Sequence, residues 1–167
     1  MKYRTKLYLA IIITAVISTL LCLGISYFQV SKIITNELRT NVMSVAAGTA
    51  SLINKDDLIS IQHARSNSTA AYDQIQQQLR TVRDDNRRED IFVKYVYIIA
   101  PRENAIDKYE YLVDAEDKNS RDYSPIGESA DEADSAKLST NFRRIYAPTD
   151  FIKDQWGTWM TAYAPIY

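Results

Sequence analysis

The sequence predicts an α+β protein: an N-terminal transmembrane helix that continues into a long helix, followed by an antiparallel sheet with flanking helices. The first observation is an uncharged stretch from Leu7 to Val30. The second is a series of apolar residues that recur every three or four positions as far as Leu52. The third is a change of composition near residue 92, after which aromatic and β-branched residues are frequent and all four prolines occur. We expect the helices before this change and the sheet after it.

The uncharged stretch is long enough to cross a membrane. About twenty apolar residues, at about 1.5 Å rise per residue, cover a hydrocarbon core of about 30 Å. Lys2, Arg4 and Lys6 precede the stretch, and every acidic residue follows it. The positive-inside rule then places residues 1–6 in the cytoplasm, residues 7–30 in the inner or plasma membrane and everything after Lys32 outside. The lipid bilayer is therefore the first expected partner.

A cleaved signal peptide is the alternative to an anchor. Its apolar core should be only about 7–15 residues long, with a small-x-small cleavage site close behind. The residues after the core, Tyr27 to Ser31, are too bulky for such a site, and the small residues from Ala46 to Ala50 lie too far away. We therefore expect an anchor that is not cleaved.

Helical periodicity continues beyond the membrane stretch and predicts a rod from about Leu7 to Ile53, whose part outside the membrane belongs to a helical region over residues 31–62. The apolar positions are Val30, Ile34, Leu38, Val42, Val45, Thr49 and Leu52. The spacing of the last four is close to that of a coiled-coil seam, so we expect a homodimer. Asn54 or Asp56 is expected to cap a second helix that runs through Gln62.

A third helix is expected from about Ala70 to Val82. Between Arg80 and Asp90, eight of eleven residues are charged, four of each sign. Such a balanced run is typical of a solvated helix end and loop.

Two strands follow. Phe92 to Ala100 is rich in aromatic and β-branched residues, with Lys94 as its one charge, which predicts a strand buried on both faces and ended by Pro101. Tyr109 to Asp114 predicts a second strand, joined to the first as an antiparallel hairpin.

The rest of the chain predicts a loop and two more strands. Residues 115–134 are polar and acidic, with turn signals at Pro125 and Gly127, and are expected to cross one face of the sheet and to end in a short helix over 131–138. Further strands are expected over 142–146 and 158–167, the second entered through a turn at Trp156 and Gly157.

Composition excludes several functions. The residues after the span hold all 21 acids, whereas three of the 20 bases precede it, which argues against binding to nucleic acid or to a lipid surface by charge. Cys22, the only cysteine, lies in the apolar stretch, so no external disulfide or thiolate metal site is expected. His63 is the only histidine, and we expect it on an exposed helix surface rather than in a metal site or a catalytic triad.

The acidic residues after the second predicted strand are not expected to bind a metal ion. Asp114, Glu116 and Asp117 lack the spacing of a calcium loop, and the four glycines of the chain form no phosphate-binding loop. We expect no enzymatic activity, no metal and no cofactor.

Four sequence blocks occur in a characteristic order: KYVYII (94–99), LVDAED (112–117), PIGE (125–128) and DQWGTWMTAYAPIY (154–167). Together with the preceding span and helix, this order resembles the Cache (PAS-like, PDC-type) extracytoplasmic sensor domains of bacterial transmembrane signalling receptors. The last block carries the most specific likeness, a Trp-Gly turn at Trp156 and Gly157 and a strand that ends in Ala-Pro-Ile at residues 164–166.

The resemblance implies a sensor domain over residues 63–167 with a PAS-like sheet. It implies a receptor of the histidine kinase (two-component), diguanylate cyclase or chemoreceptor type, whose N-terminal helix passes the ligand state to a cytoplasmic output domain. Family members continue after the Ala-Pro-Ile strand with a Gly turn and a further strand that lies centrally in the sheet. We therefore expect an incomplete sheet and a fragment of a longer receptor.

The resemblance also implies a small-molecule ligand, often a carboxylate or an amino acid, bound between the sheet and the loop that crosses it. The candidate aromatic wall consists of Tyr97, Tyr111, Tyr123, Tyr146, Trp156, Trp159 and Tyr163, with Asp114 or Arg143 for polarity. The alternative is that these aromatic residues form an ordinary core. A pilin-like structural subunit with a small α/β head is the alternative function, although the chain lacks a Gly-Phe processing site and an early Glu in the apolar stretch.

Overall fold

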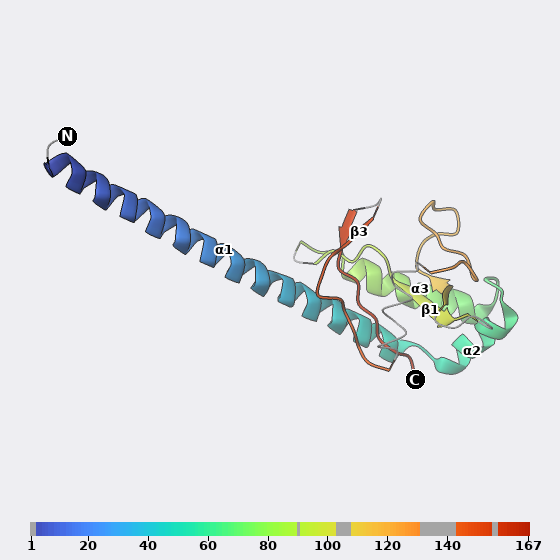
Figure 1. The fold of residues 1–167 in the computed structure, drawn as a ribbon. Helices are drawn as coiled ribbons and strands as arrows, with labels where there is room; N and C mark the ends of the chain where they lie inside the picture. The colour runs from blue at the N-terminus through green and yellow to red at the C-terminus, as the bar shows by residue number, and fades with distance from the viewer. Residues whose placement is uncertain (1–2, 90, 103–107, 131–142, 155–156) are drawn as a thin grey trace.

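The structure is a computed structural model that describes residues 3–89, 91–102, 108–130, 143–154 and 157–167. It has the predicted α+β class, and these residues form three helices and two small antiparallel sheets. The element order is α1 (Tyr3–Leu52), α2 (Lys55–Ala64), α3 (Ala70–Asp85), β1 (Tyr97–Pro101), β2 (Tyr109–Asp114), β3 (Ile152–Asp154) and β4 (Gly157–Trp159). We call the described residues from Ile53 onward the head, which packs on the C-terminal part of α1 (Figure 1).

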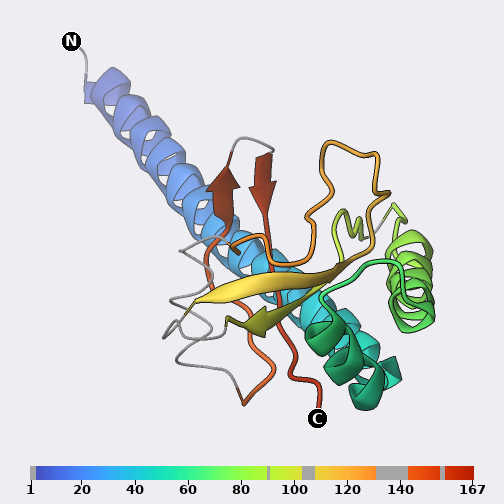
Figure 2. The same cartoon turned by 90° about the vertical axis from the view of Figure 1, so that its right-hand side faces the viewer.

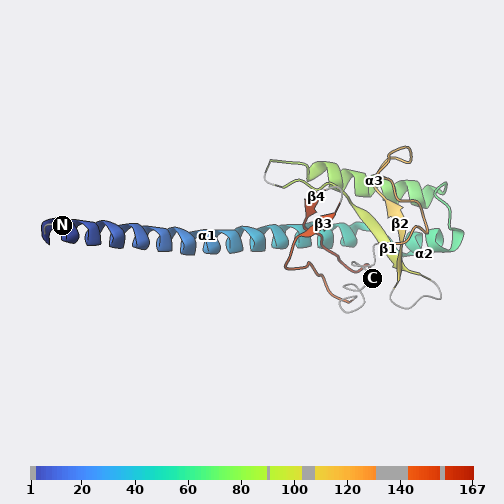
Figure 3. The same cartoon turned by 45° about the horizontal axis from the view of Figure 1, so that its top comes forward.

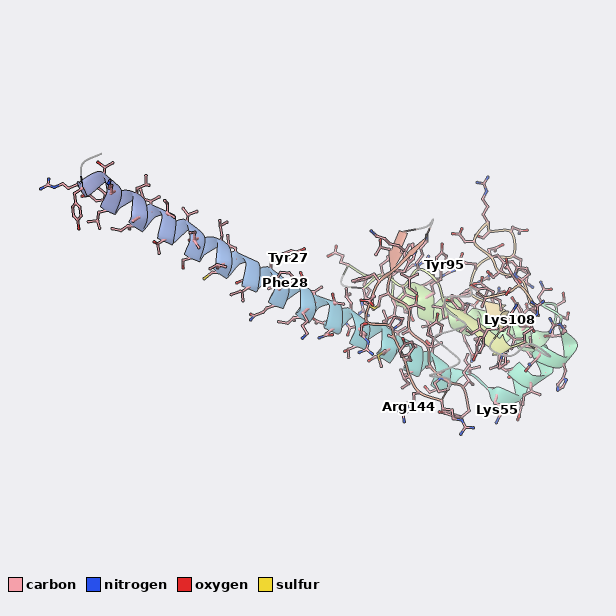
Figure 4. All side chains as sticks on the ribbon, in the orientation of Figure 1. Tyr27, Phe28, Lys55, Tyr95, Lys108 and Arg144 are labelled. Carbon is pink, nitrogen blue, oxygen red and sulfur yellow. The ribbon has the colours of Figure 1, made fainter. Side chains whose placement is uncertain are left out.

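α1 is one continuous helix, as the periodicity predicts. Its 50 residues extend about 75 Å at about 1.5 Å per residue. Residues 3–30 are exposed throughout, and partial burial begins at Ser31. By length and composition α1 can cross a membrane, although an N-terminal signal sequence also meets this criterion. Tyr27 and Phe28 contact each other edge to face near the end of the apolar stretch (Figure 4), as expected for an aromatic belt at a membrane surface.

Side-chain caps begin α2 and α3. Asn54 accepts a hydrogen bond from the backbone N–H of Asp56 at 2.9 Å, and Thr69 accepts one from the N–H of Tyr72 at 3.2 Å. Of the two predicted cap residues, Asn54 and Asp56, the N-cap of α2 is therefore Asn54. α2 ends at Ala64 and is followed by the C-cap residue Arg65, whose φ of 48° is left-handed. His63 lies exposed on α2, as predicted.

The main core lies between α3 and one face of the β1-β2 hairpin. Tyr72, Ile75, Gln76 and Leu79 are buried on one face of α3, at spacings of three and four residues. The hairpin contributes Ile98, Ala100, Leu112 and Val113, and Ile53 and Ile61 complete the cluster. The core therefore depends on the end of α1, on both shorter helices and on the first sheet.

The predicted antiparallel hairpin is confirmed, but its first strand is shorter than the predicted range of 92–100. β1 pairs with β2 from Tyr97 opposite Asp114 to Pro101 opposite Tyr109. The register shifts between Ile98 and Ile99, so Leu112 has no partner and forms a β-bulge. The prediction of a strand buried on both faces is wrong: in β1 only Ile98 and Ala100 are buried, because α3 covers one face of the hairpin and the other face is covered only in part.

The loop over residues 115–130, which we call the acidic loop, also adds to the edge of the first sheet. Its last residues pair with the edge of β2, since Tyr111 exchanges backbone hydrogen bonds with Gly127 and Glu128, each at 2.9 Å, and Ala130 donates to Tyr109. Gly127 has a φ of 87°, and a Cβ there would lie 2.7 Å from Arg65 Nη2. The helix predicted over 131–138 lies outside the described residues.

The two predicted C-terminal strands differ from the prediction. Of the strand predicted over 142–146, residues 143–146 form only an isolated bridge at Tyr146, and residue 142 lies outside the described residues. β4 ends at Trp159 and pairs with β3, a strand that the sequence did not predict. Between Thr158 and Tyr167 the chain then makes one further bridge, from Tyr163 to Tyr146, because most of this segment runs across the head rather than along a ladder. Gly157 has the expected positive φ, at 141°.

Candidate functional site

The face of the β1-β2 hairpin that points away from α3 is aromatic. Alternation along the paired strands places Tyr97, Ile99, Tyr109 and Tyr111 on this side. Tyr163, from the C-terminal segment, packs with Ile99 and Tyr111 against the buried residues Tyr109 and Ala130. The rings of Tyr97 and Tyr111 lie 5.1 Å apart at an interplanar angle of 71°, which is a favourable edge-to-face geometry. We call these five residues, Tyr97, Ile99, Tyr109, Tyr111 and Tyr163, the aromatic face.

Figure 2 shows the C-terminal segment as it leaves the β3-β4 hairpin and runs across the first sheet. Tyr163 also exchanges two backbone hydrogen bonds with Tyr146, at 2.9 and 2.7 Å. Tyr109 is buried, whereas Tyr97, Ile99, Tyr111 and Tyr163 are half-buried. The covering of this face is therefore partial, which distinguishes it from the dry core on the α3 side.

A second group of aromatic residues stands next to this face. The Lys94 ammonium lies 4.8 Å from the ring centroid of Tyr95 and 4.8 Å from that of Trp159. The two rings contact each other at 6.1 Å. Both cation-ring distances are within the range of attractive cation–π contacts. We call Lys94, Tyr95 and Trp159 the lysine cluster.

Tyr95 connects the lysine cluster to the acidic loop. Its hydroxyl donates to Asp122 Oδ2 at 3.0 Å, and burial raises the pKa of the Tyr95 hydroxyl, which stays protonated as the donor. Tyr95 precedes Tyr97 by two residues, the spacing that places side chains on one side of an extended chain. The sequence prediction omitted Lys94, Tyr95, Tyr109 and Asp122, although this period-two spacing was available to find Tyr95.

Asp114 lies opposite Tyr97 in the register, but its carboxylate is occupied by the backbone. It accepts hydrogen bonds from the N–H of Glu116 at 2.9 Å and of Ser124 at 2.8 Å. Burial raises the pKa of Asp114, and the two backbone donors oppose this shift. Gln76 donates to the carbonyls of Asp114 and Glu116 at 2.8 and 3.1 Å. Asp114 therefore positions the acidic loop.

Tyr123 belongs to the α3 side and not to the aromatic face. Its hydroxyl lies 3.1 Å from that of Tyr72, a core residue of α3, and accepts a hydrogen bond from Asn67 Nδ2. Burial is the main cause that raises the pKa of Tyr72. Arg143 is exposed, and its carbonyl accepts from the Tyr167 hydroxyl at 2.9 Å.

Of the nine predicted residues, the structure thus brings Tyr97, Tyr111 and Tyr163 together, with Tyr146 joined through its backbone and Asp114 at the edge. Trp159 lies in the lysine cluster, and Trp156 lies outside the described residues.

No protein-family model, curated protein or solved structure matches this chain. The site is therefore interpreted from its own residues.

The side chains on this side of the head combine aromatic rings with one cation. The aromatic face offers ring faces and phenol hydroxyls, and the lysine cluster offers one ammonium between two rings. Within the described ranges, no group of three His, Cys, Asp or Glu side chains is placed to hold a metal ion. A small ligand with a flat or apolar part and one charged or polar group suits this chemistry.

Proposed function

We propose that this chain is the extracytoplasmic ligand-sensing module of a membrane-bound signal-transduction receptor, with a PAS-like sensor head. The observation that carries the proposal is a hydrogen bond between α1 and the segment next to the aromatic face: Arg39 Nε donates to the carbonyl of Ala147 at 2.9 Å. Ala147 is completely buried, so the acceptor carbonyl has a fixed position in the head.

A short path leads from the aromatic face to α1. Tyr163 packs on the face and pairs through its backbone with Tyr146, and Ala147 is the next residue. A ligand that displaced the Tyr163 ring would move this backbone pair, and Arg39 would carry the movement to α1. The size of the response is limited by the difference in the affinity of the ligand for the two positions.

The orientation rests on the three bases before the span. Under the positive-inside rule, Lys2, Arg4 and Lys6 remain in the cytoplasm and the head lies outside. Alkaline phosphatase fused after Tyr167 should then be active in cells, and a fluorescent cytoplasmic reporter at the same point should be dark. The opposite pair of results excludes an external sensor.

A homodimer through α1 needs a different face from the one that the sequence indicated. Val42, Val45 and Thr49 are half-buried on the side of α1 that meets the head. The exposed residues with four-three spacing are Glu37, Asn41, Ser44, Gly48 and Ser51. We propose this exposed stripe, in place of the predicted seam of Val42, Val45, Thr49 and Leu52, as the contact between two copies.

Disulfide crosslinking in membranes tests the stripe. In a Cys22→Ser background, Ser44→Cys should crosslink between copies more readily than Val45→Cys. A higher yield at position 45 would restore the seam predicted from the sequence, and no crosslink at either position would remove the α1 dimer.

The sensor proposal is tested by separating ligand binding from its transmission. The full chain in detergent would be screened against amino acids and carboxylic acids for a rise in melting temperature. A ligand found in this way should also change the Ser44→Cys crosslinking yield. Arg39→Ala should keep the ligand-induced rise and lose the change in crosslinking, whereas the exposed control Arg143→Ala should keep both. Failure of every compound in the screen, or transmission that survives Arg39→Ala, contradicts the proposal.

A further inference from the structure

The segment that follows α3 forms a tight hairpin at the edge of the head nearest to the apolar part of α1. We call residues 86–89 and 91–93 the α3 hairpin. α1 leads from its apolar part into the head, and the chain reverses direction at α2. α3 then runs back along α1 (Figure 1). In Figure 3 the loop after α3 extends beside α1 toward its N-terminal half. This hairpin contains three of the eight charged residues of the run from Arg80 to Asp90, which the sequence predicted to be a solvated helix end and loop, and four others lie in the last turns of α3.

The α3 hairpin is held by its own hydrogen bonds. The N–H of Val93 donates to the carbonyl of Asn86 at 3.0 Å, and that of Arg88 donates to Ile91 at 2.8 Å. Asn86 Nδ2 donates to the carbonyl of Val82 at 2.8 Å, which ties the hairpin to the last turn of α3. Arg87 Nε adds a contact of 3.3 Å to the carbonyl of Val93. The direction of the hairpin is therefore fixed relative to the head.

Two adjacent apolar residues of the hairpin point in opposite directions. Ile91 is 7% exposed, whereas Phe92 is 65% exposed. Among the large hydrophobic residues described after α1, only Tyr167 is more exposed than Phe92. The Arg87 guanidinium lies 5.5 Å from the centroid of the Phe92 ring. An exposed aromatic ring is suited to a membrane surface, where aromatic side chains enter the headgroup layer. The Arg87 guanidinium itself is held by the protein, since it donates to the carbonyls of Val93 and Lys94 at 3.3 and 3.2 Å.

We propose that the α3 hairpin rests on the bilayer that α1 crosses, with the Phe92 ring in the headgroup layer. The inference depends on the membrane span and not on the sensor function. It assigns a role to a large apolar side chain that the fold fixes outside the core. A loop that contacts the membrane in this way sets the height of the head along α1.

The charges on this segment determine which lipids are needed. The run from Arg80 to Asp90 carries four charges of each sign, so an anionic surface gains little by attracting it. The contact is therefore made by the aromatic ring and does not require acidic lipids. A bilayer of phosphatidylcholine alone should be sufficient.

Depth-dependent fluorescence quenching tests the contact in the full chain. In a Cys22→Ser background, Phe92→Cys would carry an environment-sensitive nitrobenzoxadiazole label, and the chain would be placed in phosphatidylcholine nanodiscs. Ile59→Cys is the matched control, because Ile59 is 41% exposed and lies on α2, at the opposite end of the head (Figure 3). A lipid with a nitroxide on its headgroup should quench the label at 92 several-fold more strongly than the label at 59.

Two outcomes overturn the proposal. Equal quenching at both positions places Phe92 in water, and a blue-shifted emission at 92 without quenching identifies a protein contact instead. A second variant controls for an effect of the label on folding. p-Benzoylphenylalanine at position 92 keeps an aromatic ring and should crosslink to lipid on illumination. The same residue at position 59 should not crosslink to lipid. Crosslinks from 92 to a second copy alone would also refute lipid contact.

Discussion

On the α3 side of the β1-β2 hairpin, Ile61, Tyr72 and Leu79 have no exposed surface, whereas on the other side Tyr97, Ile99 and Tyr111 are only half-buried. Both faces belong to the same two strands. The difference arises from what covers them: a capped helix with a regular apolar stripe on one side, and an irregular C-terminal segment that makes a single bridge on the other. Stability is therefore concentrated on the α3 side, and the aromatic face is left able to change its contacts.

The largest expected effect tests this asymmetry directly. Leu79→Ala removes a completely buried side chain and should lower the free energy of unfolding by about 2–5 kcal/mol. Ile99→Ala, on the half-buried aromatic face, should cost about 1 kcal/mol because less apolar surface is re-exposed. Urea unfolding of the full chain in detergent, followed by tryptophan fluorescence, measures both values. Equal losses would mean that the aromatic face is ordinary core.

The ion pair on the α3 side should have the next largest effect. Glu110 is 2% exposed and accepts from Arg65 Nη1 at 2.7 Å and Nη2 at 3.2 Å, while Arg102 lies 3.8 Å away. Arg65→Ala leaves a buried carboxylate with a weaker partner and should cost about 1–3 kcal/mol, since Arg65 itself is partly solvated. Adding Glu110→Gln should recover part of this loss. A double variant less stable than Arg65→Ala alone would show that the carboxylate has other essential partners.

Two glycines allow a comparison of the head with α1. Gly157→Ala should cost about 1–3 kcal/mol, because φ is 141° and a Cβ would lie 3.0 Å from Trp159 Cζ2. Gly48→Ala, near the C-terminal end of α1, places a Cβ that meets no atom within 4 Å and should stabilise the chain by up to about 1 kcal/mol. Thermal melts of the two variants in the same detergent should therefore shift in opposite directions.

The smallest expected effect is the pH dependence of Asp114, at the boundary between the two faces. Because its folded pKa is raised, the folded state holds the proton more tightly than the unfolded state. The stability that this group contributes is present below its unfolded pKa of about 3.9 and is lost as the pH rises through its folded pKa. The stability of the wild type minus that of Asp114→Asn should therefore fall as the pH rises from about 4. A difference that rises with pH over this interval contradicts the raised pKa.

The helices could be predicted from the sequence because their signals are local. Residues such as Asn54 and Thr69 cap a helix by contacts within three positions, and the apolar stripe of α3 follows from its own spacing. The ends of the strands could not be predicted, because they depend on partners. Tyr146 and Tyr163 pair across an interval that contains β3 and β4, and no periodicity within either segment indicates this contact.

The candidate site could be predicted only where its contacts follow from local signals. Tyr97 and Tyr111 share a face because of the hairpin, which a sequence can indicate. Tyr123 is also a tyrosine with polar neighbours in the sequence. The path of its loop places it on the opposite side of the sheet, where its hydroxyl contacts that of Tyr72. Arg143 was chosen for its charge, and its exposure follows from a backbone path that has no local signal.

Leu112 gives β2 one residue more than its pairing with β1 requires. The alternation of side chains is therefore interrupted at the bulge: Tyr109 and Tyr111 lie on the aromatic side, whereas Val113, two residues after Tyr111, lies in the core. The bulge thus lets two consecutive residues, Leu112 and Val113, both enter the core, which the strict alternation of a regular strand does not allow.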